Sequence, residues 1–160
     1  GYAIGVLAAY HVGREKGEVI VIINAYGINS MTIDTVLECK KRGVKTIAVT
    51  SDSFAKIVPD GQKSRHPSNK NLYEEADIYI NNHLPIGDSI MTVDGYDDKV
   101  GSTSTFCNCF VMNCIVVETV KEFVRRGIKP PVFMSANMPG GDEHNKVMED
   151  KYGPIIKHLL

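Results

Sequence analysis

The chain has 160 residues, of which 43% are hydrophobic and 23% charged, and its formal net charge is −1. A chain of this size and composition builds one hydrophobic core, so we expect a single domain over residues 1–160. The balanced charge gives no electrostatic basis for binding nucleic acid or an anionic membrane. The longest apolar run, 110–117, is shorter than the roughly 20 residues of a membrane-spanning helix.

The first half of the chain predicts a β-α-β unit of a parallel sheet. Val19–Ile23 is a run of five β-branched residues, which is typical of a strand covered on both faces. A helix is predicted from about Ser30 to Gly43, because three cations precede this glycine and suit a helix C-terminus. Val44–Val49 is then expected to return as a parallel strand. Ligands of such sheets bind beyond the carboxyl ends of the strands, where Asn24–Ser30 and Thr50-Ser51 both lie.

The next segment predicts short elements joined by loops. The polar stretch 61–70 carries Lys63, Arg65 and His66 and no carboxylate. It is interpreted either as a mobile lid that brings one of these side chains to a phosphate, or as a solvated loop. Around it we expect a helical turn at Ser53–Val58, a strand at Asp77–Asn81 and an extended piece at the edge of the sheet, Ser89–Val93.

A long helix is predicted from Phe106 to about Arg126, where Gly127 ends it. Its first turns are apolar almost all round, so we expect it to be buried centrally or packed at a subunit interface. The hydroxyls and free N–H groups of Ser102–Thr105 precede it. They form either an anion-binding helix start or ordinary capping.

Together these elements resemble the core of a SIS (sugar isomerase) domain. Ile47–Ser51 resembles the second strand of that core, and Glu75–Ile80 resembles its third strand. The resemblance covers nearly the whole chain, and four further segments resemble a bacterial branch described as phosphoheptose-isomerase-like: Ser64–Ser68, Gly101–Thr105, Ser135–Asn137 and Gly140–Asn145.

The resemblance implies a three-layer α/β/α sandwich with a mostly parallel sheet and a flavodoxin-like, nucleotide-binding-type topology. It also implies a sugar phosphate as ligand and self-association as a dimer or tetramer. No metal or cofactor is expected, because the histidines other than His144 show no metal-ligand spacing. Because family members begin with further helices and a first strand, we expect residues 1–160 to be the C-terminal two-thirds of a longer protein. The four cysteines, three of them in one predicted helix, are interpreted as small buried hydrophobic residues in a reducing cytoplasm.

Residues from the ligand-side loops and the start of the long helix are the implied binding residues. Asn24 and Tyr26 stand where the family has two serines that bind the phosphate. Asn24 still has an amide donor, whereas the bulk of Tyr26 is able to fill the phosphate space. The implied binding residues are Asn24, Tyr26, Gly27, Asn29, Ser30, Thr50, Ser51, Ser102, Thr103, Ser104 and Thr105.

The C-terminal segment contains the candidates for acid–base chemistry. A last strand is predicted at Pro130–Ser135, followed by a helix that carries Glu143 and His144. These two side chains are equipped to move a proton through an enediol, or they act as a helix-start residue and a structural contact. Phosphoheptose isomerases present a histidine on the corresponding helix, whereas the early turns of this helix offer Asn108 and Asn113 and no histidine. Three functions therefore remain: a phosphosugar aldose–ketose isomerase, a non-catalytic phosphosugar sensor, and a scaffold without a ligand.

Overall fold

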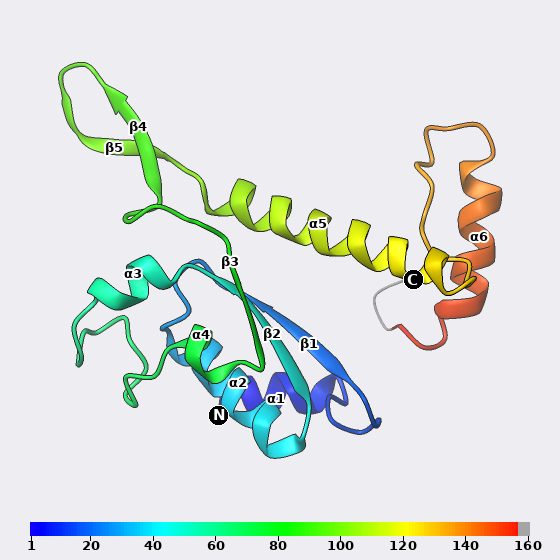
Figure 1. Cartoon of the computed structure of the whole chain (residues 1–160), viewed down its shortest axis with the longest axis horizontal. Coiled ribbons are helices and arrows are strands. Elements are labelled where there is room, and N and C mark those ends of the chain that lie inside the picture. The colour runs from blue at the N-terminus through cyan, green and yellow to red at the C-terminus, as the bar shows by residue number, and fades with distance from the viewer. Residues whose placement is uncertain (157–160) are drawn as a thin grey trace. The chain divides into compact units, whose positions relative to one another are not determined.

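The computed structural model describes residues 1–156 and divides the chain into two compact parts. The first part runs from Gly1 to Cys114, and the second begins at Ile115. The boundary falls within one long helix, α5 (Ser104–Arg125), which Figure 1 labels. The two parts are described separately below.

A parallel three-stranded sheet forms the centre of the first part, in the order β1-β2-β3. Its strands are β1 (Val19–Ile23), β2 (Lys45–Thr50) and β3 (Ile78–Asn81). Val21 of β1 lies opposite Ile47 of β2, which in turn lies opposite Ile78 of β3. The predicted α/β class with a parallel sheet is confirmed, and the three predicted strands differ from the observed ones by one residue at most.

Helix α2 (Ser30–Arg42) covers the sheet as the sequence predicts. Its N-terminus is capped by the Asn29 side chain, which accepts a hydrogen bond from Thr32 N at 3.0 Å. Gly43 ends it in the left-handed conformation, with φ of 70°. The buried face packs Ile33 and Val36 against Ile22 and Ala48 of the sheet and against Leu72, the first residue of helix α4 (Leu72–Glu75). α1 (Tyr2–Ala9) packs against α2.

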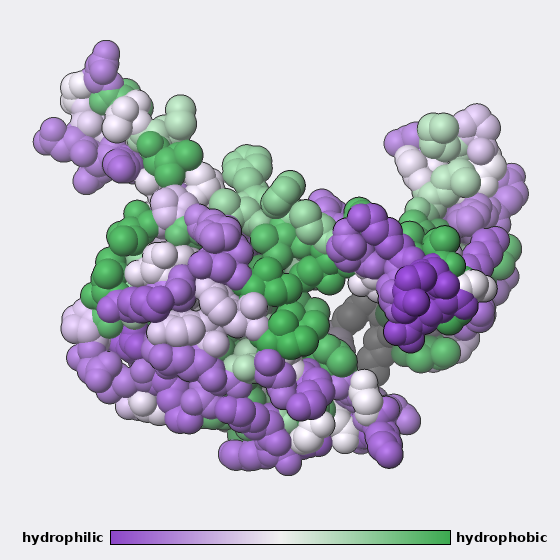
Figure 2. All heavy atoms as spheres, viewed as in Figure 1, coloured by the Kyte–Doolittle hydropathy of each residue, from purple (hydrophilic) through white to green (hydrophobic). Residues whose placement is uncertain are grey.

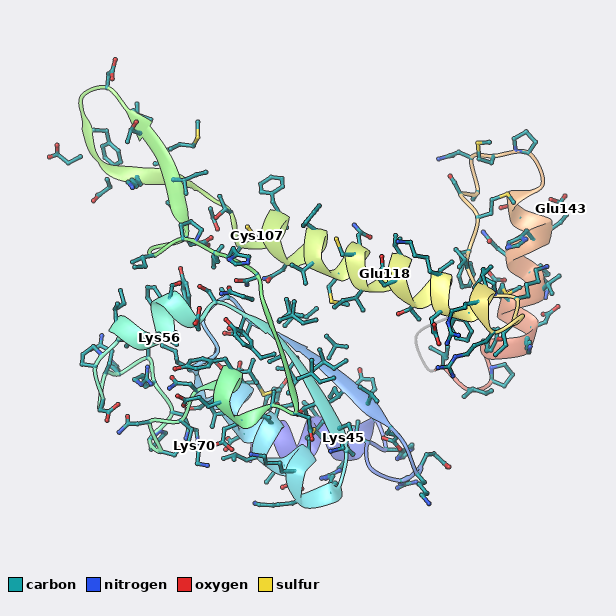
Figure 3. The ribbon with its side chains drawn as sticks, in the orientation of Figure 1. Lys45, Lys56, Lys70, Cys107, Glu118 and Glu143 are labelled. Carbon is teal, nitrogen blue, oxygen red and sulfur yellow. The ribbon has the colours of Figure 1, made fainter. Side chains whose placement is uncertain are left out.

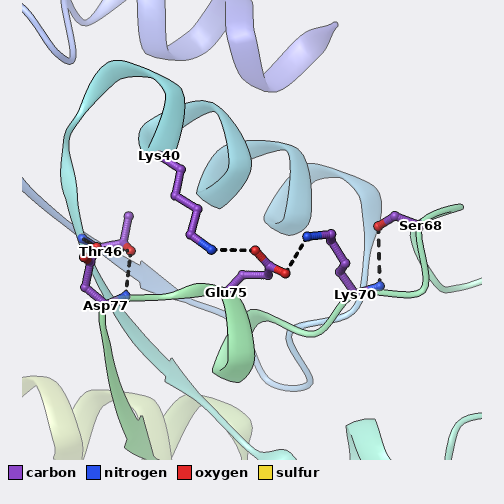
Figure 4. Close-up of polar contacts among 6 residues, drawn as sticks. All are labelled: Lys40, Thr46, Ser68, Lys70, Glu75 and Asp77. Atoms are coloured by element: carbon purple, nitrogen blue, oxygen red, sulfur yellow. Dashed lines mark hydrogen bonds and ion pairs between the residues drawn. The ribbon is translucent and has the colours of Figure 1, made fainter.

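Two short helices and the loop between them follow β2. These helices are α3 (Asp52–Ile57) and α4 (Leu72–Glu75). Glu75 receives ion pairs from Lys40 of α2 at 2.7 Å and from Lys70 of the loop at 2.6 Å (Figure 4). These charges hold α4 and the end of the loop beside α2.

The segment 89–102 differs from the prediction. Ser89–Val93 (β4) does not lie at the edge of the main sheet; it pairs with β5 (Tyr96–Ser102) in a separate antiparallel hairpin. The strands are joined by Asp94-Gly95, a dipeptide that favours two-residue hairpin loops. That dipeptide was the available signal for the missed strand.

Helix α5 (Ser104–Arg125) has close to its predicted length but contains no buried residue. The expectation that it is buried within the chain is therefore wrong, and the expectation of a subunit interface remains a prediction. Phe106 and Phe110 are 74% and 70% exposed. Cys109 and Cys114 are also exposed, so the expectation that the cysteines are buried is wrong for these two. Figure 2 shows apolar side chains at the surface along α5 and on the hairpin.

In the second part, the predicted strand Pro130–Ser135 is also wrong, since no strand is assigned there. The two prolines lack N–H donors, and side chains of α6 (Gly141–Tyr152) satisfy the backbone instead of a neighbouring strand. Asn145 pairs with both the N–H and the carbonyl of Met134, each at 2.8 Å.

Within residues 1–156, no helix is long and apolar enough to cross a membrane. The same residues contain no cluster of three or more His, Cys, Asp or Glu side chains suited to a metal ion.

Candidate functional site

Polar groups from three segments meet at the carboxyl end of the parallel sheet. The loop 24–29 follows β1, Thr50 ends β2, and Asn82 follows β3. Asn82 is 4% exposed, and its amide Nδ2 donates to Asn108 Oδ1 of α5 at 2.8 Å. The first turns of α5 are thereby connected to the end of the sheet where ligands of parallel α/β folds bind.

The loop after β1 uses its own side chain as a hydrogen-bond acceptor. Asn24 Oδ1 accepts from Tyr26 N at 3.2 Å and from Gly27 N at 2.8 Å. Together with the Asn29 cap of α2, these bonds satisfy the N–H groups of Tyr26, Gly27 and Thr32. A phosphate at these donors would have to replace amide oxygens of the protein. Ser30, the first residue of α2, is exposed beside them.

The Tyr26 ring is held in place beside this loop by an aromatic contact. Its ring stacks on Phe54 of α3 with a centroid distance of 3.7 Å and an interplanar angle of 23°. Desolvation, and secondarily the charge of Asp88, raises the pKa of the Tyr26 hydroxyl. The hydroxyl therefore stays protonated at neutral pH and is a hydrogen-bond donor. The effect of Asp88 also shows that the turn before β4 lies near this loop.

Thr50 and Ser51 are completely buried. Ser51 Oγ donates to the carbonyl of Leu84 at 2.9 Å, so it holds the chain that leaves β3. Thr50 Oγ1 has no hydrogen-bond partner and lies against Gly27. In the described structure both hydroxyls face the protein interior, where they shape the loop.

The start of α5 has an acceptor of its own. The Asp88 carboxylate accepts hydrogen bonds from the N–H groups of Thr103 at 2.9 Å and Ser104 at 2.7 Å, and from Ser102 Oγ. Desolvation acts to raise the pKa of Asp88, but these hydrogen bonds outweigh it and lower the pKa. The residue is thus an anion at neutral pH. Thr105, in the first turn of α5, is exposed.

A groove of about 420 Å³ runs beside this end of the sheet. It lies between α1, β1 and α2, and Asn24 and Asn29 belong to its lining. Most of the other lining side chains are aliphatic, including Leu7 and Ile22. Such a lining suits an apolar group rather than a phosphate.

The two candidate proton carriers lie in the second part. Glu143 is exposed on α6 (Figure 3). His144 Nε2 lies 2.9 Å from the carbonyl of Val132, so this nitrogen carries the ring proton and donates it. His144 therefore helps to hold the segment before α6.

Residues that the sequence analysis did not select contribute strongly to this region. Asp88 and Asn82 act through contacts with the distant helix α5, which no local pattern reveals.

Arg65 was considered as a phosphate ligand on a lid, but it is only 7% exposed. Its guanidinium donates to Ala55 O, Asn69 O and Asn71 Oδ1, at distances between 2.6 and 3.1 Å. It is an internal anchor of the loop 58–71.

Comparison with known proteins identifies the class to which this fold belongs. Residues 1–51, which contain the complete β1-α2-β2 unit, match the SIS domain family. Residues 1–51 of the chain therefore belong to a SIS domain, as the resemblance of its motifs predicted.

Several bacterial relatives extend the similarity over most of the chain. A UPF0309 protein of Caldanaerobacter subterraneus is 35% identical over 148 residues, which are 90% of this chain and 58% of the relative. One from Geobacillus thermodenitrificans is 37% identical over 143 residues, covering 89% of this chain and 56% of the relative. One from Listeria monocytogenes is 33% identical over 156 residues, covering 98% of this chain and 65% of the relative. The chain thus spans little more than half the length of the first two relatives.

Proposed function

We propose that this chain recognises a phosphorylated sugar at the carboxyl end of its parallel sheet. The observation that carries the proposal is the convergence of the β1 loop, the ends of β2 and β3, and the start of α5. Ser51 N donates to Ala25 O, Asn82 N donates to Thr50 O, and Asn82 Nδ2 donates to Asn108 Oδ1. The match of residues 1–51 to the SIS domain family supports a phosphosugar as the ligand class. An adjacent aromatic ring, Tyr26, supplies a protonated hydroxyl for a sugar oxygen.

Binding would proceed by exchange of acceptors in the β1 loop. Phosphate oxygens accept hydrogen bonds from N–H groups more strongly than a neutral amide oxygen does, because they are charged. The ligand would therefore displace Asn24 Oδ1 from the N–H groups of Tyr26 and Gly27. The Asn24 side chain would then be free to present its Nδ2 donor.

Isomerisation of the sugar is a second candidate function. It would need a proton carrier, for which Glu143 is the exposed carboxylate and His144 the neighbouring imidazole. Asn24 and Tyr26 stand in place of the two loop serines, and the early turns of α5 carry Asn108 and Asn113 and no histidine. An asparagine cannot act as a general acid or base at neutral pH. We therefore favour a binding module over an isomerase.

We also propose self-association as a dimer or tetramer. The exposure of Phe106 and Phe110 on α5 supports this proposal, since large apolar side chains grouped at a surface mark interaction sites. Sedimentation equilibrium should give the mass of several chains. Phe106→Ser combined with Phe110→Ser should reduce it to the mass of one chain, whereas Lys121→Ser on the same helix should not. A wild-type mass of one chain would contradict self-association.

A cytoplasmic location remains a proposal that rests on the cysteine pattern.

A thermal-shift screen of sugar phosphates and their free sugars tests the binding function. A ligand that binds only the folded protein raises its unfolding midpoint with concentration. We expect a shift with at least one sugar phosphate and not with its free sugar. Asn24→Asp keeps an acceptor for the loop N–H groups but adds a negative charge, so it should abolish the shift. Asn113→Asp, which adds the same charge at an exposed position of α5, should retain it.

Absence of any shift with the wild-type chain would overturn the proposal. If a sugar phosphate binds, NMR of the mixture over time separates the two candidate functions. Conversion between aldose and ketose phosphates that depends on Glu143 or His144 would establish the isomerase. Binding without conversion would establish the sensor.

A further inference from the structure

Three side chains of the first part form a connected row of close polar contacts outside the site described above. Ser68 Oγ lies 2.7 Å from His66 Nδ1, and His66 Nε2 lies 3.3 Å from Asp34 Oδ1. Ser68 and His66 belong to the loop 58–71, whereas Asp34 belongs to α2. Folding thus aligns a hydroxyl, an imidazole and a carboxylate from segments about thirty residues apart in the sequence.

The backbone around this row is held in place. His66 N donates to Ile28 O at 2.7 Å, and Leu72 N donates to Gly27 O at 2.8 Å. The buried Arg65, directly before His66, donates to Ala55 O of α3 and to Asn69 O near the C-terminal end of the loop. The imidazole is therefore positioned by several bonds that do not involve its own ring.

The hydrogen-bond pattern determines the tautomer of His66. The backbone N–H of Ser68 donates to Nδ1 at 3.0 Å, and an N–H group can only donate. Nδ1 therefore carries a lone pair, and the proton of the neutral ring resides on Nε2, which faces Asp34. It follows that the Ser68 hydroxyl also donates to Nδ1. This is the proton arrangement that a base needs in order to activate a serine.

The row is accessible at its nucleophilic end. Ser68 is exposed, whereas the side chains of His66 and Asp34 retain 16% and 37% exposure. A small substrate can therefore reach the serine oxygen while the imidazole is partly shielded from water.

We propose that Ser68 is a nucleophile for small carboxylic esters, with His66 as its general base and Asp34 as the residue that positions the imidazole. This activity goes beyond the proposed phosphosugar binding and does not depend on it. Ser68 Oγ attacks the ester carbonyl carbon while its proton moves to His66 Nδ1. The bond to the leaving alkoxide breaks, and His66 returns the proton to that oxygen. Water then cleaves the acyl-serine by the same route and releases the carboxylic acid.

Covalent labelling with a fluorophosphonate tests the proposal without requiring the natural ester. Ser68 Oγ bonds to phosphorus, fluoride leaves, and the hydroxyl proton moves to His66. Peptide mass spectrometry of the labelled 160-residue chain locates the adduct. Ser64, an exposed serine of the same loop, serves as an internal reference. A positioned general base contributes about 100-fold or more, so we expect Ser68 to react at least about 100 times faster than Ser64.

Variants of these residues distinguish a Ser68 hydroxyl that His66 activates from one that is only exposed to solvent. His66→Gln should lower the labelling rate of Ser68 by at least about 100-fold. Asp34→Asn should lower it about tenfold and alter its pH profile, since the carboxylate stabilises the imidazolium. Asp34 is at a partly exposed helix position, so this variant should fold even if His66→Gln does not. Ser68→Ala should retain the wild-type unfolding midpoint and lose hydrolysis of p-nitrophenyl acetate.

Equal labelling of Ser64 and Ser68 would overturn the proposal, because it would show that His66 gives no activation. If the labelling rate of Ser68 is unchanged in the folded Asp34→Asn variant, Asp34 does not position the His66 imidazole. Absence of any adduct on Ser68 would also overturn it, whatever the result of the phosphosugar screen.

Discussion

The Asp88 carboxylate accepts a hydrogen bond from the backbone N–H of Ser104 at 2.7 Å, and thereby joins the turn before β4 to the first residue of α5. An isolated two-stranded hairpin is at best marginally stable in water. This contact, with the second one to Thr103 N, fastens the β4–β5 hairpin at its base.

Replacement of Asp88 should therefore destabilise the first part of the molecule. Because the carboxylate acts as a helix cap from a distant segment, Asp88→Ala should lower the free energy of unfolding by about 1–2 kcal/mol. Urea denaturation measures the loss. Asp97→Ala, on an exposed position of β5, should change the free energy of unfolding by less than about 0.5 kcal/mol. Equal effects of the two substitutions would show that the cap contributes nothing.

Gly27 should not tolerate a side chain. Its φ is +61°, and an added Cβ would lie 2.7 Å from Leu72 Cβ and 2.8 Å from Thr50 Oγ1. Gly27→Ala should cost about 3 kcal/mol, from the left-handed conformation and the overpacking together. Gly17 has a positive φ with nothing within 4 Å of such a Cβ, so Gly17→Ala should cost only about 1 kcal/mol. Similar unfolding midpoints for the two variants would contradict the close approach of Gly27 to Thr50.

Asp77 should confer stability that is lost in acid. Hydrogen bonds from Lys45 Nζ and from the backbone N–H of Thr46 lower the pKa of Asp77 to about 2 (Figure 4 shows its contact with Thr46). Since the folded-state pKa lies below the unfolded value, the contribution is complete above about pH 4 and disappears as the pH falls toward 2. Asp77→Asn should cost about 1 kcal/mol at pH 7, discounted for partial exposure, and nothing near pH 2.

Unfolding free energies measured from pH 7 to pH 2 test this dependence. The wild-type and Asp77→Asn curves should converge between pH 4 and pH 2. Asp60→Asn, in the exposed part of the loop, should stay within about 0.5 kcal/mol of the wild type throughout. A constant difference between the wild type and Asp77→Asn at all pH values would contradict the effect of the carboxylate charge.

Arg65 should be required for the closed loop 58–71. Its removal leaves the carbonyls of Ala55 and Asn69 without their donor, so Arg65→Ala should cost about 3 kcal/mol. Limited proteolysis should cut the variant between residues 58 and 71 much faster than the wild type. Lys63→Ala, two residues earlier and exposed, is the matched control. Unchanged proteolysis of Arg65→Ala would show that other contacts hold the loop.

Local sequence patterns predicted the elements that are specified by residues close together in the sequence. The β-branched run of β1 and the Asn29 and Gly43 ends of α2 each lie within a few residues of the structure that they specify. The same patterns predicted the length of α5, but not its exposure. Burial depends on which other surface covers a helix, and its own periodicity does not contain that information.

The sequence by itself determined the parallel β-α-β unit, because strand, helix and turn preferences act between neighbouring residues. The SIS-domain class was indicated by the resemblance of its motifs to a known family. Only the tertiary structure decided which acceptor each polar group meets. It placed Asp88 at the N–H of Ser104, joined Asn82 to Asn108, and buried Arg65 among carbonyl oxygens. Each of these contacts joins residues at least ten positions apart, so its existence depends on the path of the whole chain and not on either residue's neighbours.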